Sequence, residues 1–419
     1  MNPKTLLISI LRGGPRKLAC ATVVVCALMM VAGGTSQAQT FTVLHAFSYG
    51  PDGNQPYAGL LQDARGNLYG TTTDGGFSGP GSVYRLTQVQ AGWVSSVMTE
   101  FNQNDENGYH PVSRLTLGPD GAFYGTTEEG GNPSCSFGCG TVFRLDPSTG
   151  FSRTVIYRFS GSDGYWPISE LTFDGTGDIF GTTSAGGADN GGTVFELIRN
   201  SNQWTHSVVY NFGNFGGEEP VGGLIFDSAG NLYGTTYEGG GLCSCGVVFE
   251  LSPSDGRWMY RVLHSFDTHM DGAWPVSSLT IDGAGNLYGT TTAGGPGLSA
   301  GTVFELSPSG NNWIFSTVHA FAPGYGEPPF FGPAGPVLLD ATGALYGTAC
   351  DDGAYGQGSV FELTPTNGGW VFTTLHDFSA LEDGEYPIGN LLRDANGNIF
   401  GTTWSGGEYG VGTVWELTP

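Results

Sequence analysis

Basic residues are scarce in this chain of 419 residues, which has 14 Lys and Arg against 38 Asp and Glu. Four of the 14 lie within the first 17 positions, and residues 39–419 carry 10 arginines, no lysine and a formal net charge of −28. A field of that sign repels polyanions, so we expect no nucleic-acid partner. Without lysine, Schiff-base chemistry and a phosphate-binding P-loop are excluded as well.

Helical periodicity is also absent after residue 38, and so are zincin, nucleophile-elbow and EF-hand motifs. Most histidines follow a repeat, since His45, His264, His319 and His376 occupy one equivalent position. A residue needed in every copy favours a packing role, because one active site needs one copy. The sequence therefore assigns no catalytic residue.

The first 38 residues have the layout of a secretory signal peptide. Lys4, Arg12, Arg16 and Lys17 form a basic start, an apolar run covers 18–32, and small residues precede Ala38. We expect cleavage after Ala38, export to the periplasm or the extracellular space, and no stable membrane span afterwards. The alternative is an uncleaved anchor helix, for which the apolar run is short.

One motif, Tyr/Phe-Gly-Thr-Thr, recurs seven times, with its glycine at 70, 125, 181, 234, 289, 347 and 401. Each copy of about 55 residues contains four short runs rich in β-branched and aromatic residues, bounded by Gly, Pro and Asp. We name them strands a, b, c and d in chain order, the motif being strand b. Seven antiparallel four-stranded units predict an all-β, seven-bladed β-propeller, in which each blade buries the faces of its neighbours.

The two ends of the chain predict how the ring closes. The seventh copy stops after its strand c, at 413–417, whereas an unpaired strand d covers 41–47. The N-terminal strand should therefore complete blade seven, which removes an exposed edge. Residues 39–419 then form a single domain. An open array with a loose N-terminal segment is the alternative.

Loop lengths differ between the two faces of the predicted disc. The a–b turn is constant and opens with Asp in six copies: Asp63, Asp174, Asp227, Asp282, Asp340 and Asp394. By contrast, the b–c distance from motif Gly to strand c Val is 13, 17, 13, 14, 14, 13 and 13 residues, and d–a loops vary similarly. Since repeat proteins place binding surfaces on the face that takes insertions, this variable face is the candidate, although neutral drift would also produce the pattern.

The variable face carries aromatic and acidic residues. The d–a loops read Asp/Asn-Gly-x-x-Pro, and the residue before Pro changes between copies. The candidate ligand-binding residues are His110, Trp166, Glu219, Trp274, Tyr386, Asp351 and Asp352. Such a rim would suit stacked sugar rings or Ca²⁺ held by oxygen ligands. Alternatively, Asp-Gly makes turns, the aromatic rings pack between blades and the acids confer solubility.

Five cysteines follow the signal segment. A Cys135–Cys139 disulfide suits an exported protein. A Cys243–Cys245 bridge would close a very small ring, so zinc bound by these four cysteines is the alternative. We expect Cys350 to be a small buried residue.

The combination Leu-Tyr-Gly-Thr-Thr, a Gly-rich loop, Gly-Thr-Val-Phe-Glu-Leu and Leu-His-x-Phe resembles the GloVer tandem repeat of exported bacterial choice-of-anchor proteins, over about residues 41–419. The units are also similar in length to kelch repeats. The resemblance implies an exported protein of unassigned activity and supplies no catalytic residues. Some relatives end in an anchor segment that this chain lacks, so we expect it to be released or periplasmic.

These observations favour a non-enzymatic binding or scaffold propeller that recognises a glycan, a cell-surface polymer or an extracellular protein. No cofactor is required, although Ca²⁺ is kept as an option. The alternative is a secreted propeller enzyme, a polysaccharide lyase, hydrolase or kelch-type oxidase. An enzyme should break the repeat with unlike polar residues near the axis, and the irregular sixth copy, around 325–336 and 349–352, is the first place to look.

Export should remove the first 38 residues. We expect the protein recovered outside the cytoplasm to begin at Gln39, which mass spectrometry of its N-terminal peptide would establish. Recovery of a chain that retains the apolar run 18–32 would favour the anchor helix instead.

Overall fold

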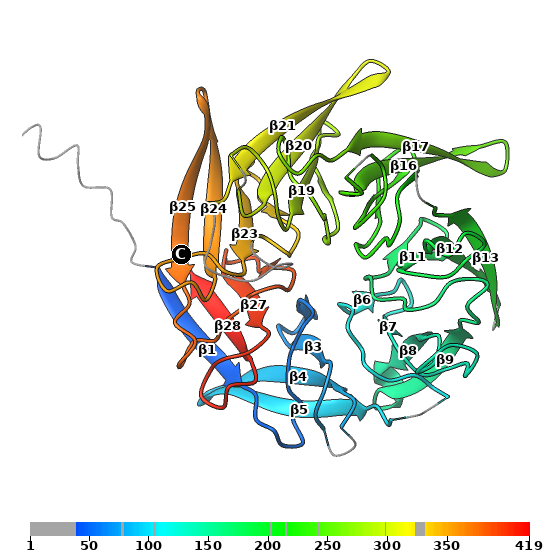
Figure 1. Ribbon diagram of the computed structural model, residues 1–419. Coiled ribbons are helices and arrows are strands. Elements are labelled where there is room, and N and C mark those ends of the chain that lie inside the picture. The colour runs from blue at the N-terminus through cyan, green and yellow to red at the C-terminus, as the bar shows by residue number, and fades with distance from the viewer. Residues whose placement is uncertain are drawn as a thin grey trace, which may run out of the picture. The chain divides into compact units, whose positions relative to one another are not determined.

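The seven motif copies form the second strands of seven four-stranded antiparallel sheets, arranged around an axis (Figure 1). The computed structural model describes residues 39–76, 79–103, 106–201, 203–213, 216–241, 243–297, 299–322 and 332–419. Residues 41–418 form one compact unit. The predicted signal peptide, 1–38, with its predicted cleavage site after Ala38, lies outside the described residues. The predicted seven-bladed propeller is confirmed.

Each blade has a short inner strand a and progressively longer strands outward. The inner strands a are β2 (Leu61–Gln62), β6 (Thr116–Leu117), β10 (Thr172–Phe173), β14 (Ile225–Phe226), β18 (Thr280–Ile281), β22 (Leu338–Leu339) and β26 (Leu392–Arg393). The motif strands b are β3 (Leu68–Thr72), β7 (Phe123–Thr127), β11 (Ile179–Thr183), β15 (Leu232–Thr236), β19 (Leu287–Thr291), β23 (Leu345–Ala349) and β27 (Ile399–Thr403).

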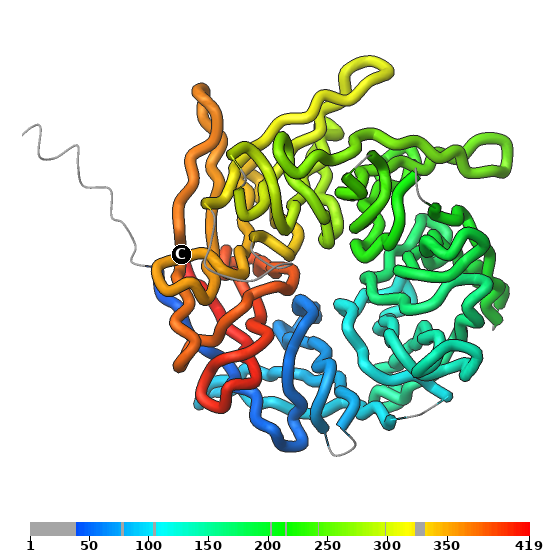
Figure 2. The backbone as a smooth tube through the Cα atoms, in the orientation of Figure 1, coloured from blue at the N-terminus to red at the C-terminus, as the bar shows by residue number. Residues whose placement is uncertain are grey.

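Strands c and d form the outer hairpin of each blade. The strands c are β4 (Ser82–Val89), β8 (Thr141–Asp146), β12 (Thr193–Asn200), β16 (Val247–Ser254), β20 (Thr302–Ser309), β24 (Ser359–Thr366) and β28 (Thr413–Thr418). The strands d are β5 (Gly92–Glu100), β9 (Ser152–Arg158), β13 (Gln203–Asn211), β17 (Arg257–Ser265), β21 (Asn312–Ala320), β25 (Gly369–Asp377) and, from the N-terminus, β1 (Thr40–Ala46). Several of these hairpins project outward from the ring (Figure 2).

The motif glycine makes room for an aromatic ring of strand c. Gly234 on β15 pairs in register with Phe249 on β16. A Cβ at Gly234 would lie 2.6 Å from the Phe249 Cζ, and in all seven copies it would come closer than 3.0 Å to the facing ring. Only glycine therefore lets the aromatic side chain lie flat across strand b.

The two motif threonines have separate hydrogen-bonding roles. The first crosses to the next blade, as Thr235 Oγ1 does when it donates to the Ser277 carbonyl at 3.0 Å. The second bonds strand c of its own blade, as in the 2.8 Å contact between Thr183 and Thr193 hydroxyls. Both are buried, so each hydroxyl satisfies its own hydrogen-bonding need while joining two elements.

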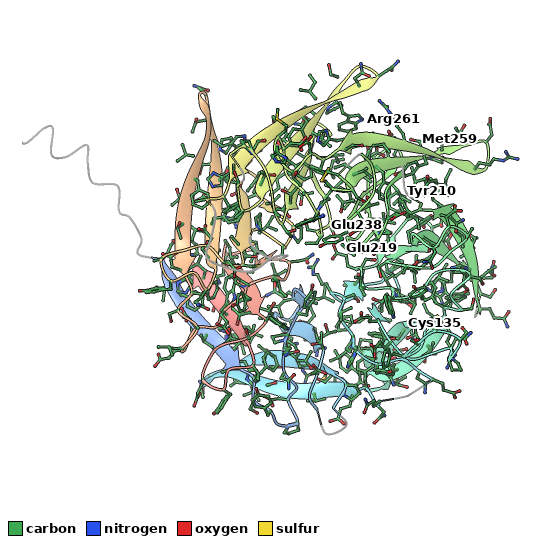
Figure 3. All side chains as sticks on the ribbon, in the orientation of Figure 1. Cys135, Tyr210, Glu219, Glu238, Met259 and Arg261 are labelled. Carbon is green, nitrogen blue, oxygen red and sulfur yellow. A yellow bond between two sulfur atoms is a disulfide. The ribbon has the colours of Figure 1, made fainter. Side chains whose placement is uncertain are left out.

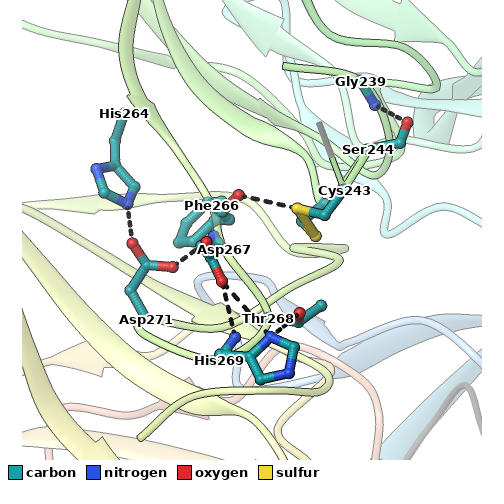
Figure 4. The surroundings of a disulfide bond; sticks show 10 residues. Gly239, Cys243, Ser244, His264, Phe266, Asp267, Thr268, His269 and Asp271 are labelled. Carbon is teal, nitrogen blue, oxygen red and sulfur yellow. Dashed lines mark hydrogen bonds and ion pairs between the residues drawn. A yellow bond between two sulfur atoms is a disulfide. The ribbon is translucent and has the colours of Figure 1, made fainter. Parts of the chain in front are cut away.

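The shared histidine position stacks on the strand d of the neighbouring blade. The His264 ring lies parallel to Phe315 at 4.2 Å, and its Nε2 is 2.7 Å from an Asp271 oxygen at the base of the d–a loop (Figure 4). The His376 ring stacks in the same way on Phe41 of β1, at 3.7 Å. His264, His319 and His376 therefore pack the blades together, whereas the partner of His45 is Asp52, 3.1 Å away in the loop that follows its own strand.

The stacking of His376 on Phe41 also helps to close the ring of blades. β1 pairs beside β28 in the last sheet, and the Phe47 amide donates to the Gly412 carbonyl at 3.0 Å. The chain's first strand thus occupies the position that β25 holds in the sixth blade. The predicted closure is confirmed.

The a–b turns follow the predicted chemistry. The Asp63 carboxylate accepts hydrogen bonds from the amides of Arg65 and Asn67, at 2.9 Å each. The second copy, with Gly118 at this position, uses Asp120, which accepts from the Ala122 amide at 3.2 Å. These aspartates are turn residues.

Removing the aromatic ring of Phe41, which joins β1 to the sixth blade, should destabilise the whole propeller. Phe41→Ala deletes contacts with His376, Phe378 and Trp415, and should lower the free energy of unfolding by about 2 kcal/mol. Thermal or urea unfolding measures it. Val371→Ala, on the exposed outer face of β25, is the control and should change stability by less than about 0.5 kcal/mol. Equal stability of both variants would contradict closure by this contact.

Candidate functional site

A cavity of about 420 Å³ lies where the d–a loops of all seven blades converge. Each loop contributes residues that follow its proline, beginning with Tyr57, Val112, Ile168, Val221, Val276, Ala334 and Ile388. Glu128, Glu219 and Tyr237 line it from the b–c and d–a loops. The cavity therefore belongs to the variable face, and Glu219 and Glu238 lie near the centre of the ring (Figure 3).

A polar cluster crosses the cavity from four different blades. Glu170 accepts a hydrogen bond from the Ser278 hydroxyl at 2.7 Å and from the Asn390 amide at 3.2 Å. The Arg114 guanidinium lies 3.7 Å from the same carboxylate and donates through Nε to the Leu60 carbonyl at 3.0 Å. We call Arg114, Glu170, Ser278 and Asn390 the axial cluster.

The axial cluster occupies one repeat position, three residues after the proline. The other blades have Gly59, Gly223 and Pro336 there. A Cβ on Gly223 would lie 2.5 Å from the Glu170 Cγ, and one on Gly59 would lie 2.6 Å from the Asn390 Cβ. The glycines therefore make the space in which the four polar side chains meet.

The residue before each loop proline forms a second ring at the cavity mouth. In six copies it has a left-handed backbone with φ between 54° and 60°, at Gln55, His110, Trp166, Glu219, Trp274 and Tyr386. Its amide and carbonyl tie two neighbouring loops, as when Glu219 bonds the Gly191 carbonyl and the Tyr237 amide at 2.9 Å each. Glycine would adopt this conformation without steric cost, so the large side chains are not explained by the backbone.

Three of these six side chains contact residues that follow a strand b. His110 lies between Asp74 and Glu129, at 3.4 and 3.3 Å, and the hydrogen bond that it donates to the Asp74 carboxylate raises its pKa. The Trp274 ring stacks on Tyr237, with centroids 6.1 Å apart. Tyr386 lies against Trp404 at 6.2 Å.

Two carboxyl groups of the cavity wall resist ionisation. Burial, together with the neighbouring charge of Glu129, raises the pKa of Glu128. Burial also raises the pKa of Glu219, with added repulsion from Glu238 and Glu218. These groups could donate as well as accept hydrogen bonds toward a ligand.

The structure distributes the sequence-predicted residues over three places. Glu219 lines the central cavity, whereas His110, Trp274 and Tyr386 lie at its mouth. Trp166 lines a second, outer cavity. Burial raises the pKa of Asp351, which lies in the β23–β24 loop. Asp352 instead accepts from the Ser359 hydroxyl at 3.4 Å.

Sequence reasoning missed the axial cluster and Tyr57. The available signal was the position three after the loop proline, which is the most chemically varied of the repeat: Gly, Arg, Glu, Gly, Ser, Pro and Asn. Among the described residues of the sixth copy, which was singled out as the first place to look, Ala334 and Pro336 line the cavity. Residues 323–331 of that copy lie outside the described residues.

Both cysteine pairs form disulfides, Cys135–Cys139 in the β7–β8 loop and Cys243–Cys245 in the β15–β16 loop. The small ring of the second pair therefore does form, and the zinc alternative for these four cysteines does not apply. Cys350 is buried, and burial raises its thiol pKa. Within the described ranges, no three His, Cys, Asp or Glu side chains gather as metal ligands would.

The chain belongs to the Gloeobacter/Verrucomicrobia repeat family, whose model matches residues 31–176, 134–334 and 326–419. No curated protein matches it. Among solved structures it is similar to the extracellular domain of a putative one-component system from B. thetaiotaomicron, with a TM-score of 0.55 and 12% identity over 90% of this chain. The chain spans 40% of that protein's length.

A second similar structure is a putative 6-phosphogluconolactonase from Bacteroides uniformis, with a TM-score of 0.51 and 14% identity, covering 80% of this chain and 88% of that one. Identities this low show a shared propeller fold and nothing of its chemistry. In the described part of the chain, no helix has the length and apolarity needed to cross a membrane.

Glu128→Gln should stabilise the protein at neutral pH. The raised pKa of Glu128 means that the folded state prefers the protonated carboxyl. Its stabilising contribution is full below the ordinary glutamate pKa and is lost as pH rises through the folded-state pKa. The melting temperature of the variant should therefore exceed that of the wild type near pH 8, and the gap should close near pH 4, because both side chains are then neutral.

Asp63→Asn is the control, because its expected effect on stability has the opposite sign. Burial opposes ionisation of Asp63, but hydrogen bonds from Asn67 and Arg65 outweigh it and hold the pKa below its ordinary value. That variant should be less stable than the wild type at neutral pH, with the loss shrinking in acid. A Glu128→Gln protein that melts below the wild type at every pH would contradict the assignment.

Proposed function

We propose that this protein is an exported, non-enzymatic binding propeller that holds a glycan in the central cavity of its variable face. One observation carries the proposal: seven otherwise similar blades place unlike side chains around one cavity, at the positions closest to the axis. A purely structural repeat has no need of such differences, whereas a ligand without sevenfold symmetry does.

The lining suits a sugar. Tyr57 is 41% exposed despite its size, and Tyr237 is backed by Trp274, so aromatic surface is offered to a pyranose ring. The axial cluster pairs the Arg114 charge with Glu170, which leaves a polar, nearly neutral set of donors and acceptors for hydroxyl groups. The net charge of −28 disfavours an anionic glycan.

An enzyme acting on polysaccharide is the second candidate. The observation that favours it is the pair of wall carboxyls, Glu128 and Glu219, whose raised pKa values would suit a general acid. Release of reducing sugar that disappears in Glu128→Gln would support this candidate over simple binding.

Binding is tested by titration calorimetry of the purified protein with glucose, N-acetylglucosamine, xylose and mannose oligomers, from monomer to hexamer. We expect at least one series to bind and Tyr57→Ala to weaken it by about tenfold or more, since a stacking surface is lost. Trp166→Ala combined with Trp274→Ala should also weaken binding, because it alters the rim.

Tyr49→Ala is the matched control, because Tyr49 is 78% exposed and lines neither cavity. It should bind like the wild type. The proposal fails if no series binds, or if Tyr57→Ala and Tyr49→Ala are indistinguishable from the wild type.

A further inference from the structure

A second cavity, of about 480 Å³, opens on the same face outside the central one. Its polar lining consists of serine hydroxyls and one amide, including Ser134, Ser136 and Asn190, beside the rings of Tyr165 and Trp166. Among the residues that the structure describes, no acidic or basic side chain lines it, although acidic residues greatly outnumber basic ones in the chain. Hydroxyl and amide groups next to aromatic rings are the chemistry that recognises a neutral sugar.

One loop lines both cavities. In the β9–β10 connection, Tyr165 and Trp166 face the outer cavity, whereas Ile168 and Glu170 face the central one. Two residues of chain span at most about 7 Å, so the two linings adjoin across Pro167. Cys135 of the outer lining lies further from the ring centre than Glu219 of the central lining (Figure 3). The cavities thus follow one another from the axis outward.

The outer cavity is built on tied loops. The Cys135–Cys139 disulfide closes the β7–β8 loop, and the Ser134 hydroxyl donates to the Ser160 carbonyl at 3.1 Å. The Trp166 amide donates to the Cys139 carbonyl at 3.1 Å, which joins this loop to the β9–β10 loop. Such ties lower the entropy that binding would otherwise cost.

Two polar groups of this lining remain free for a ligand. The side chains of Ser136 and Asn190 make no hydrogen bond to any other residue that the structure describes, and both residues are exposed. Asn190 also has a left-handed backbone, with φ 63°. An amide and a hydroxyl on either side of two aromatic rings can bond adjacent hydroxyls of one sugar.

We infer that the outer cavity is a second sugar subsite, and that the ligand is a neutral oligosaccharide running from the central cavity over the β9–β10 loop into it. The inference rests on the proposed glycan binding and adds the length and direction of the chain. A monosaccharide would fill one cavity alone, whereas a longer oligomer gains a second set of contacts without a second loss of translational freedom.

Titration calorimetry with the same four oligomer series tests this. We expect affinity to rise by about tenfold or more from the shortest oligomer that binds to the hexamer. Tyr165→Ala combined with Asn190→Ala should bring the hexamer down to the affinity of the shortest oligomer and leave the shortest unchanged. Tyr57→Ala should weaken oligomers of every length.

Paired disulfide variants give the matched control. Cys135→Ser with Cys139→Ser should flatten the dependence on length, since it frees one edge of the outer cavity. Cys243→Ser with Cys245→Ser should preserve it, because neither of these two cysteines lines a cavity. Circular dichroism and melting temperature establish that each variant is folded.

The outcomes separate the two proposals. Binding with an affinity independent of length, or equal losses for short and long oligomers in the Tyr165 and Asn190 double variant, overturns the outer subsite and leaves glycan binding intact. Failure of every oligomer to bind overturns both.

Discussion

The structure depends on one close contact, the aromatic ring of each strand c lying over a glycine of strand b. Where Gly234 faces Phe249, or Gly289 faces Phe304, no side chain larger than hydrogen fits. The ring then occupies the position of a missing side chain, and its far side packs against an aromatic of the preceding outer strand, as Phe304 does with Phe266. Because the contact recurs in every blade, it fixes the spacing of strands within a blade and of each blade from the next.

Exact repetition of a charged side chain is physically excluded at the axis, however. A core position has equivalent surroundings in each of the seven blades. The seven copies of an axial position, by contrast, lie close to one another. Seven copies of Arg114 or of Glu170 would place like charges together at a cost of several kcal/mol. The chain instead has one arginine, one glutamate, two neutral polar residues, two glycines and a proline there, so that Arg114 and Glu170 pair. The axis is thus the place where a repeat protein can acquire an asymmetric site.

The sequence predicted the features that are local or that repeat: the four strands, the Asp turns, the closure by β1 and the packing role of the histidines. It also placed Glu219 and Trp166 among ligand-binding candidates, both of which line cavities. It could not predict the axial cluster, because Glu170 contacts Ser278 and Asn390 from 108 and 220 residues away, and no periodic pattern records which blades meet across an axis. Nor could it tell that Asp352 bonds Ser359 at the start of the following strand, because that contact depends on how the β23–β24 loop folds back.

At the cavity mouth, the strongest physical sign of a side-chain role is a free-energy cost that the backbone conformation alone does not explain. Six large residues, Trp166, Trp274 and Tyr386 among them, hold a left-handed backbone that disfavours each of them by roughly 1 kcal/mol relative to glycine. The backbone bonds made there use only amide and carbonyl groups, which glycine would supply equally well. Summed over the ring, the cost approaches the stability margin of a typical domain, about 5–15 kcal/mol. A chain with 72 glycines has not placed one at these six positions. Side-chain contacts within the fold, such as those of Trp274 with Tyr237 and of Tyr386 with Trp404, offset part of the cost.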